Sequence, residues 1–339
     1  MDIVTPDLSQ IKQPVKPLKR MLKVLDLGNG KRRVEINFSS LDLIHTCLRK
    51  AKYALLDGYR SETEADALVF GTAIHKALEH WYCLPEDLRQ LTDAESKEAS
   101  TLSGSTDVGG FVYDTALESI HQFVIHTQPL RWLGDDDKRS IANGIKILKA
   151  YFKHYANDGL EVYRDGSGKA MIEYQAEFTV HDDDKLQVVF HGQIDLILKS
   201  KLTGQIYIVD HKTTAALGKD FYNRINPNHQ YSLYLNAGKN HLGLKDAQFM
   251  VNGIQVAKTK CEFARQITDR TEEDFQDSIK ALVHASKLIL NCIDDGYFPN
   301  SSPNPCAAYG GCNFHDVCSA GNESMKKILL ENKYPKESA

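Results

Sequence analysis

Two apolar runs near the middle of the chain each bring an acidic residue into a strand-like segment. The first run, 186–198, holds Asp195, and the second, 206–209, leads directly into Asp210. Lys212 follows the second acid by two positions. Because side chains alternate faces along a strand, Asp210 and Lys212 should point the same way. This layout could hold a divalent metal and a water beside a phosphodiester.

A polar connector, 199–204, ends in glycine and predicts a hairpin turn between the two runs. If the chain folds back near Leu202, Asp195 lies almost opposite Asp210, with roughly 5 Å between the two Cβ atoms. Two carboxylates that close repel each other unless a cation lies between them. The pattern therefore makes metal-assisted hydrolysis of nucleic acid the leading interpretation.

An acid-x-lysine triplet by itself carries little information, because such triplets are common. Four others occur in this chain and are interpreted as solvated surface, at 95–97, 136–138, 183–185 and 331–333. The triplet at Asp210 differs because it ends a run that is apolar on both faces, which is typical of a central strand. A charged group in that environment is costly unless it is paired or bound to metal.

Two helical segments add further candidates. The pattern over 70–82 predicts an amphipathic helix with Gly71 and His75 on one face, spaced by four residues. A neutral imidazole there could be a metal ligand, and an ordinary surface or core histidine is the alternative. Gln230 and Tyr234 likewise share one face of a later helix, where simple packing of the tyrosine is the alternative.

Taken together, these patterns resemble a known family. The chain carries, in order, Gly71-x-x-x-His75, Gly192-x-x-Asp195, Asp210-x-Lys212-Thr and Gln230-x-x-x-Tyr234. Their order and context resemble the RecB-like nucleases of the PD-(D/E)XK superfamily over roughly 38–318. The resemblance implies an α/β fold with a restriction-endonuclease-like core, in which a mixed central β-sheet is flanked by helices.

The resemblance also assigns expected roles. A catalytic Mg²⁺ or Mn²⁺ would be held by His75, Asp195, Asp210 and the backbone carbonyl of His211, whose side chain should face away. Oxygen ligands with one imidazole suit either ion. Lys212 would orient or activate the attacking water, and Gln230 and Tyr234 would support that lysine or contact the DNA backbone. From the preceding strand-like segment, Glu173 or Glu177 could also reach the site, with a solvent-facing glutamate as the alternative.

The cysteines form a second group of candidates. Of seven, Cys306, Cys312 and Cys318 are spaced evenly in a Gly/Pro-rich loop and look like metal ligands, with Cys47 as the fourth. This arrangement resembles the iron–sulfur nucleases of the AddB family and of CRISPR adaptation, which implies a [4Fe–4S] cluster, although many relatives space two of the late cysteines more closely. Zinc, with His315 as a possible ligand, is the alternative. The odd cysteine count and the lack of a secretory signal disfavour disulfides.

The order of segments predicts one main domain. We expect a flexible arm over 1–33, a nuclease domain over 34–320 with a helical insert at 83–165, and a charged tail over 321–339. Within that domain, a loop at 300–320 would bring its cysteines to Cys47. Further helices are predicted at 111–126, 137–157 and 272–294.

Composition narrows the possible functions. With 339 residues, 42% hydrophobic and 25% charged, the chain can bury a large core. A net charge of −4 argues against a protein that coats DNA nonspecifically, so phosphate contacts must be confined to a cleft. No Walker loop is present, so unwinding of DNA would need a partner. The sequence also has no apolar run long enough to span a membrane.

The resemblance implies a metal-dependent DNA nuclease, and more specifically an exonuclease acting on linear DNA in recombination, repair or CRISPR-adaptation-like processing. Its partners would be single-stranded or duplex DNA ends and a helicase or recombinase, in the cytoplasm of a bacterial or phage-infected cell and away from membranes. A structure-specific endonuclease or nickase is the rival enzyme. A noncatalytic module that binds DNA ends is the rival from another class, although the intact Asp195, Asp210 and Lys212 argue against it.

Overall fold

The computed structural model describes residues 22–60, 65–102, 115–130, 133–134, 137–301, 303–307 and 311–336. Its strands are β1 (Leu22–Gly28), β2 (Lys31–Asn37), β3 (Leu160–Val162), β4 (Ile172–Asp182), β5 (Leu186–Ser200), β6 (Ile206–Thr214), β7 (Gln248–Gln255) and β8 (Phe263–Thr268). Its α-helices are α1 (Phe38–Thr46), α2 (Leu48–Ala51), α3 (Asp66–Cys83), α4 (Asp93–Thr101), α5 (Ala116–His126), α6 (Ile141–Tyr155), α7 (Lys219–Asn223), α8 (His229–Asn236), α9 (Glu272–Asp294), α10 (Pro303–Ala307), α11 (His315–Ser319) and α12 (Glu323–Lys333).

The strands form one mixed sheet, ordered β1-β2-β5-β6-β7-β8, with β3 and β4 pairing with β5. The β2–β5 and β6–β7 pairs are parallel, and the other pairs are antiparallel. This confirms the predicted mixed sheet flanked by helices. The hairpin from β5 to β6 is also confirmed, and Leu202 lies at its exposed tip.

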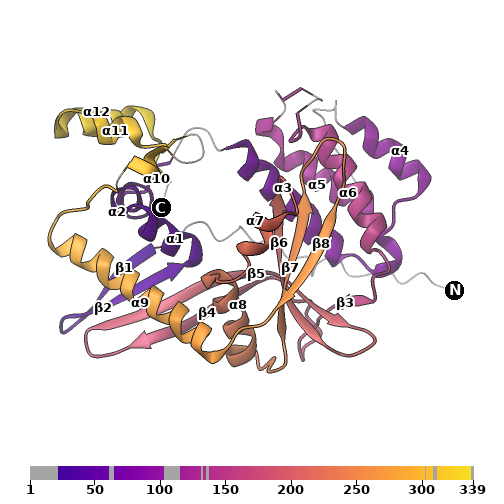
Figure 1. The fold of residues 1–339 in the computed structure, drawn as a ribbon, viewed down its shortest axis with the longest axis horizontal. Coiled ribbons are helices and arrows are strands. Elements are labelled where there is room, and N and C mark those ends of the chain that lie inside the picture. Colours follow the sequence, from indigo (N-terminus) through magenta and orange to yellow (C-terminus); the bar gives the residue numbers. More distant parts are fainter. Residues whose placement is uncertain are drawn as a thin grey trace.

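The sheet forks along β5, and this fork decides where the acids lie. One edge of β5 is taken by β4, which pairs with 187–196. On the other edge, β2 pairs with 186–191 and β6 pairs only with 196–199. Residues 192–195 therefore have no strand partner on that edge. Figure 1 shows the result, with β1 and β2 running to the left and β6, β7 and β8 standing upright on the right.

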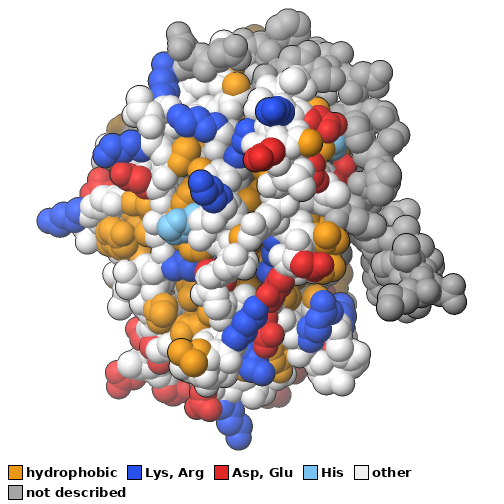
Figure 2. Space-filling model, turned by 90° about the vertical axis from the view of Figure 1, so that its right-hand side faces the viewer, with side chains coloured by type: hydrophobic (Ala, Val, Ile, Leu, Met, Phe, Trp, Pro, Cys, Tyr) orange, Lys and Arg blue, Asp and Glu red, His pale blue; other side chains and the backbone are white. Residues whose placement is uncertain are grey.

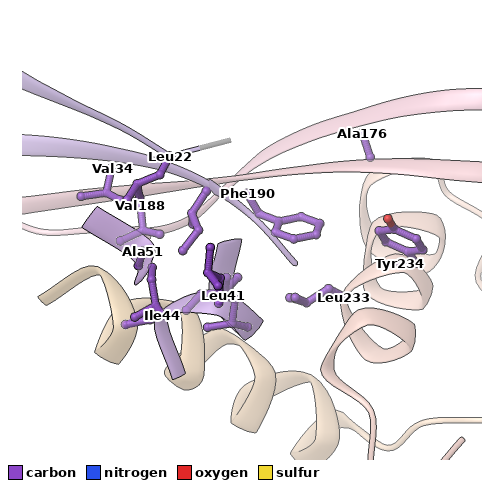
Figure 3. Packing of buried hydrophobic residues seen from close by; sticks show 14 of the residues in the cluster. Leu22, Val34, Leu41, Ile44, Ala51, Ala176, Val188, Phe190, Leu233 and Tyr234 are labelled. Carbon is purple, nitrogen blue, oxygen red and sulfur yellow. The ribbon is translucent and has the colours of Figure 1, made fainter. Parts of the chain in front are cut away.

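Two apolar cores cover the two faces of the sheet. The first lies against α1, α8 and α9, and the second against α3, α5 and α6. Figure 3 shows part of the first, where Phe190 faces Leu41 of α1 and Leu233 of α8. Along β6, Ile208 belongs to the first core and Val209 to the second, and both are fully buried. The expected central strand, apolar on both faces, is thus present.

The insert predicted for 83–165 holds α4, α5 and α6. Apolar residues of these helices pack into the second core. The helix expected over 111–126 is present from 116, and 111–114 lie outside the described residues. The helix expected over 137–157 is α6, and the one expected over 272–294 has those bounds. None of the helices in the described ranges is long and apolar enough to cross a membrane.

The N-terminal prediction needs a correction. Residues 22–33 belong to the β1–β2 hairpin, contrary to the flexible arm predicted over 1–33, and 1–21 lie outside the described residues. The turn works because Gly28, Asn29 and Gly30 all adopt positive φ, which glycine and asparagine tolerate. Burial of apolar residues of this hairpin in the first core then holds it in the sheet.

The C-terminal tail predicted over 321–339 is also more ordered than its charge suggests. Residues 323–333 form α12, which buries Leu330. Just beyond it, Tyr334 stacks on Phe314 with 4.8 Å between ring centroids, and its hydroxyl donates to Asp316 Oδ1 at 2.6 Å. The apolar positions of the tail therefore pack even though most of its residues are charged or polar.

Candidate active site

The fork in the sheet brings Asp195 and Asp210 together. The last pair of the β5–β6 ladder is Leu196 with Val209, so the register puts the two acids next to each other one step beyond it. There the ladder is replaced by a side-chain contact, because Asp195 Oδ2 accepts the backbone N–H of His211 at 2.8 Å. The predicted juxtaposition of the two acids is therefore present.

Lys212 closes the site on the β6 side. Its Nζ lies 2.8 Å from Asp210 Oδ2 and 3.1 Å from Oδ1. It also donates to Gln230 Oε1 at 3.2 Å, while Gln230 Nε2 donates to Asp210 Oδ1 at 3.3 Å. The lysine is thus held by an acid on its own strand and an amide at the start of α8. Strand alternation had predicted that Asp210 and Lys212 lie together, and the family resemblance had implied that Gln230 supports the lysine.

Tyr234 fills the open edge of the fork from α8. Its hydroxyl accepts the backbone N–H of Gln193 and forms a hydrogen bond with the Gln230 side chain. Gly192 makes room for the ring, since a Cβ there would lie 2.7 Å from Tyr234 Cε1. Burial raises the pKa of the Tyr234 hydroxyl well above its ordinary value. Tyr234 therefore supports Gln230 and, through it, Lys212.

His75 reaches the acids from α3, on the other face of the sheet. Its Nδ1 lies 3.4 Å from Asp195 Oδ2, and its ring forms a hydrogen bond with the backbone carbonyl of His211. Gly71 lets the helix approach β6 closely, because a Cβ there would lie 3.1 Å from Thr213 Oγ1. Burial, and then the charge of Lys212, lowers the pKa of His75 to about 4. The imidazole is therefore neutral at physiological pH.

The charges of the site depend on one another. Burial raises the pKa of Asp195 and of Asp210 to about 6 each, and Lys212 acts against that rise at both. Burial alone would lower the pKa of Lys212, but Asp210 and Asp195 outweigh it, so the pKa rises. Both carboxylates and the ammonium are consequently charged at neutral pH.

The donor set fits a hard divalent ion in its chemistry. It combines two carboxylates, a neutral imidazole and a backbone carbonyl. Asp210 Oδ2 is buried and accepts no hydrogen bond, although it lies within ion-pair distance of Lys212. As they stand, no three His, Cys, Asp or Glu side chains of the described residues are grouped closely enough to hold an ion. Lys212 supplies the positive charge that the acids need.

A second polar group lies beside Asp195. Glu173 sits opposite it on β4 with a positive φ of 50°, and Gln193 Nε2 donates to its Oε2. Burial, then Asp195, raises the pKa of Glu173 to about 9. Sequence reasoning missed Lys76, which is nearly buried and pairs with Glu79 three residues later on α3. The available signal was a lysine on the helix that carries His75.

Glu177, the other glutamate proposed from the sequence, lies elsewhere. It is 60% exposed and faces His191 at 3.7 Å and Arg33 at 3.6 Å. The solvent-facing alternative therefore holds for this residue. The side chain of His211, in contrast, faces away from the acids as expected, and Asn252 Nδ2 lies 2.7 Å from its Nδ1.

The cysteine segments also meet in space. Ser301 Oγ donates to the carbonyl of Thr46 at 2.6 Å, and Arg49 N donates to the carbonyl of Pro299 at 3.1 Å. Burial would raise the pKa of Cys47, but hydrogen bonds from Lys50, Ser301 and Arg49 outweigh it and lower the pKa. Donors of this kind stabilise a thiolate.

The late cysteines come near one another, and Cys318 also lies near Cys47. Cys312 N donates to the carbonyl of Cys306 at 2.8 Å. Burial, and among other groups the nearby Cys312 and Cys47 thiols, raises the pKa of Cys318. A cavity of about 690 Å³ is lined by Cys306, Cys312 and His315, among others. No ligand cluster is formed among the described side chains, and the predicted closure of the 300–320 loop on Cys47 stays a prediction.

The chain was compared with curated proteins and with solved structures. No curated protein matches the chain. A "Putative exonuclease" from Eubacterium rectale is 12% identical with a TM-score of 0.45, over 89% of this chain and 90% of that one. The protein SSO0001 is 11% identical with a TM-score of 0.26, over 59% and 86%. Because both TM-scores lie below 0.5, neither carries the argument.

The family assignment comes from the sequence match. Residues 35–319 match the model of the PD-(D/E)XK nuclease superfamily. That range contains the fork of the sheet and every side chain of the candidate site. The chain therefore belongs to the PD-(D/E)XK nuclease superfamily.

Proposed function

We propose that this protein is a metal-dependent deoxyribonuclease that degrades linear DNA from its ends. The observation that carries the proposal is the convergence of Asp195, Asp210 and Lys212 at the fork of the sheet, with His75 beside them. Burying acids and an ammonium costs stability, and such groups cluster at functional sites, which supports an assignment to phosphodiester hydrolysis.

In this proposal His75, Asp195, Asp210 and the carbonyl of His211 hold Mg²⁺ or Mn²⁺. The bound ion supplies Lewis acidity at the scissile phosphate and acidifies a water. Lys212 orients that water and stabilises charge that develops on the phosphate. Gln230 keeps the ammonium aimed at Asp210 through its contacts at 3.2 and 3.3 Å.

The preference for ends rests on the likeness of the four motifs to RecB-like exonucleases. A structure-specific endonuclease or nickase uses the same chemistry and remains the rival. We infer that DNA ends are the partner and that a helicase or recombinase supplies any unwinding inside the cell. Figure 2 shows basic and acidic side chains interspersed on one face, which therefore offers no continuous basic surface to DNA.

The test is cleavage of linear DNA and covalently closed circles with Mn²⁺. Linear DNA should be degraded and circles spared, whereas nicked circles would favour the endonuclease.

Asp210→Asn should abolish cleavage while the fold survives. Asp294→Asn is the matched control, because Asp294 also forms an ion pair, with Arg32 at 2.7 Å, but on the exposed face of α9. Undiminished cleavage by Asp210→Asn would rule out the site.

We also propose that Cys47, Cys306, Cys312 and Cys318 bind a [4Fe–4S] cluster that ties the two ends of the domain together. The thiolate-stabilising donors around Cys47 support this assignment. Anaerobically purified protein should be brown, with broad absorbance near about 400 nm and bound iron. Cys47→Ser should remove the colour. Cys261→Ser, which changes a cysteine outside the proposed ligand set, should keep it. A colourless protein containing zinc would favour the zinc alternative.

A further inference from the structure

A chain of buried polar side chains lies directly behind the catalytic strand. Asn252 Nδ2 is 2.7 Å from His211 Nδ1 and also donates to the Tyr151 hydroxyl at 2.7 Å. Asn252 and Tyr151 are completely buried, and His211 is 3% exposed. Buried polar groups are usually paired. The Asn252 amide nitrogen is paired on both sides and so holds the surrounding elements in fixed positions, whereas Asn252 Oδ1 has no hydrogen-bond partner among the described residues.

The chain continues into the helix that carries His75. The Tyr151 hydroxyl lies 2.9 Å from that of Tyr82, which accepts a hydrogen bond from Arg265 at 3.1 Å. Arg265 pairs with Asp158 at 2.5 Å. The network therefore joins β6, β7 and β8 to α3 and α6. It crosses the second core, and its side-chain hydrogen bonds involve neither Asp195 nor Asp210.

His211 is the point at which this network meets the active site. Its N–H binds Asp195, and its carbonyl accepts a hydrogen bond from the His75 ring. Its own ring packs edge-on against His75 and stacks on Tyr82, with centroids 5.7 and 5.8 Å away. A shift of the His211 side chain would thus move its own backbone N–H and carbonyl. These two groups hold Asp195 and the His75 ring in place.

We propose that Asn252 is a positioning residue for the active site. By joining His211 to Tyr151, it fixes the backbone of β6 between Asp210 and Lys212, and with it the spacing of the His211 carbonyl, Asp195 and His75. The inference rests on the proposed nuclease function. It adds a residue from β7, a strand that carries none of the four motifs, and gives that residue no contact with the substrate.

The experiment compares Asn252→Ala with Asn143→Ala. Asn143 is a matched control, because it is a buried asparagine of the same core that bridges two carbonyls, of Lys138 at 2.7 Å and Ala257 at 3.2 Å, away from the acids. Mn²⁺ affinity is measured by calorimetry without DNA, and kcat and KM are measured on linear DNA. Melting temperatures report the loss of packing common to both variants.

We expect Asn252→Ala to weaken Mn²⁺ binding and to lower kcat by about tenfold each, as for other residues that orient metal ligands. KM for DNA should stay within about threefold, because no DNA contact is lost. Asn143→Ala should lose stability without either change. Tyr151→Phe, which keeps the His211–Asn252 contact, provides a milder variant if Asn252→Ala fails to fold, and should show a smaller loss of the same kind.

Equal behaviour of the Asn252 and Asn143 variants in metal affinity and kcat would overturn the proposal and leave Asn252 as a packing residue. Lack of hydrolysis by the unmodified protein would instead count against the proposed function. The comparison of Mn²⁺ affinities between the variants would still decide the role of Asn252 in that case.

Discussion

Asp195 accepts the backbone N–H of His211 at 2.8 Å, at the point where the β5–β6 ladder ends. The contact ties the two strands together one step beyond their last backbone pair. It also orients the carboxylate toward Asp210 and His75. One side chain therefore closes the fork of the sheet and contributes a charge to the site.

The free energy of unfolding of the metal-free protein should reflect the cost of burying the charged carboxylate of Asp195. Asp195 has a pKa of about 6 in the folded protein against an ordinary value of 3.8. The folded state thus binds its proton more tightly, so this group destabilises the protein at neutral pH and ceases to do so as pH falls below about 4.

Asp195→Asn should therefore stabilise the metal-free protein at about pH 7.5, by about 1–3 kcal/mol at most. The gain should shrink as pH falls from about 6 to about 4. Urea unfolding in EDTA at several pH values measures it. A gain that does not change with pH would show that Asp195 is not buried in its charged form.

Metal affinity should fall steeply in acid. Asp195 and Asp210 each take up a proton as pH falls through about 6, whereas His75, with its pKa near 4, stays neutral. Because only ionised carboxylates bind the ion, each acid should weaken binding by up to about tenfold per pH unit below about 6. Calorimetric titration with Mn²⁺ across this range measures the slope. A flat profile down to about pH 5 would exclude these two ligands.

Gln230→Ala should free the Lys212 ammonium from its partner on α8. We expect kcat to fall by about tenfold, with KM for DNA and stability nearly unchanged, because the amide acts on the lysine rather than on the fold. Gln276→Ala on the exposed side of α9 is the control, since its amide donates to Glu272 on the same helix, at 2.8 Å. Steady-state kinetics on linear DNA compares the two variants. Equal kcat values would remove Gln230 from the catalytic group.

Gly192→Ala should disturb the packing of Tyr234. The added Cβ would lie 2.7 Å from Tyr234 Cε1 and 2.9 Å from Phe190 Cε1, so at least one ring must move. Overpacking of this kind costs about 1–3 kcal/mol. Gly166→Ala is the control, because a Cβ there meets nothing within 4 Å. Unfolding in urea and the kcat of both variants should show a loss for position 192 alone.

Local pattern was sufficient for much of the site. Asp195 and Asp210 are only fifteen residues apart and are joined by a short hairpin, so alternation and turn chemistry placed them correctly. Helical spacing likewise put Gly71 with His75, and Gln230 with Tyr234. These relationships depend on distances along the chain that a strand or a helix fixes by itself.

The remainder depends on contacts between segments that are distant in the sequence. Asn252 meets Tyr151 across 101 positions, and Arg265 meets Tyr82 across 183, so no local pattern relates them. The β1–β2 hairpin was missed for the same reason, because its burial depends on the first core. Strand and helix periods are intrinsic to the backbone, and they determined which residues could do chemistry. Only packing across the sheet decided which buried groups hold them in place.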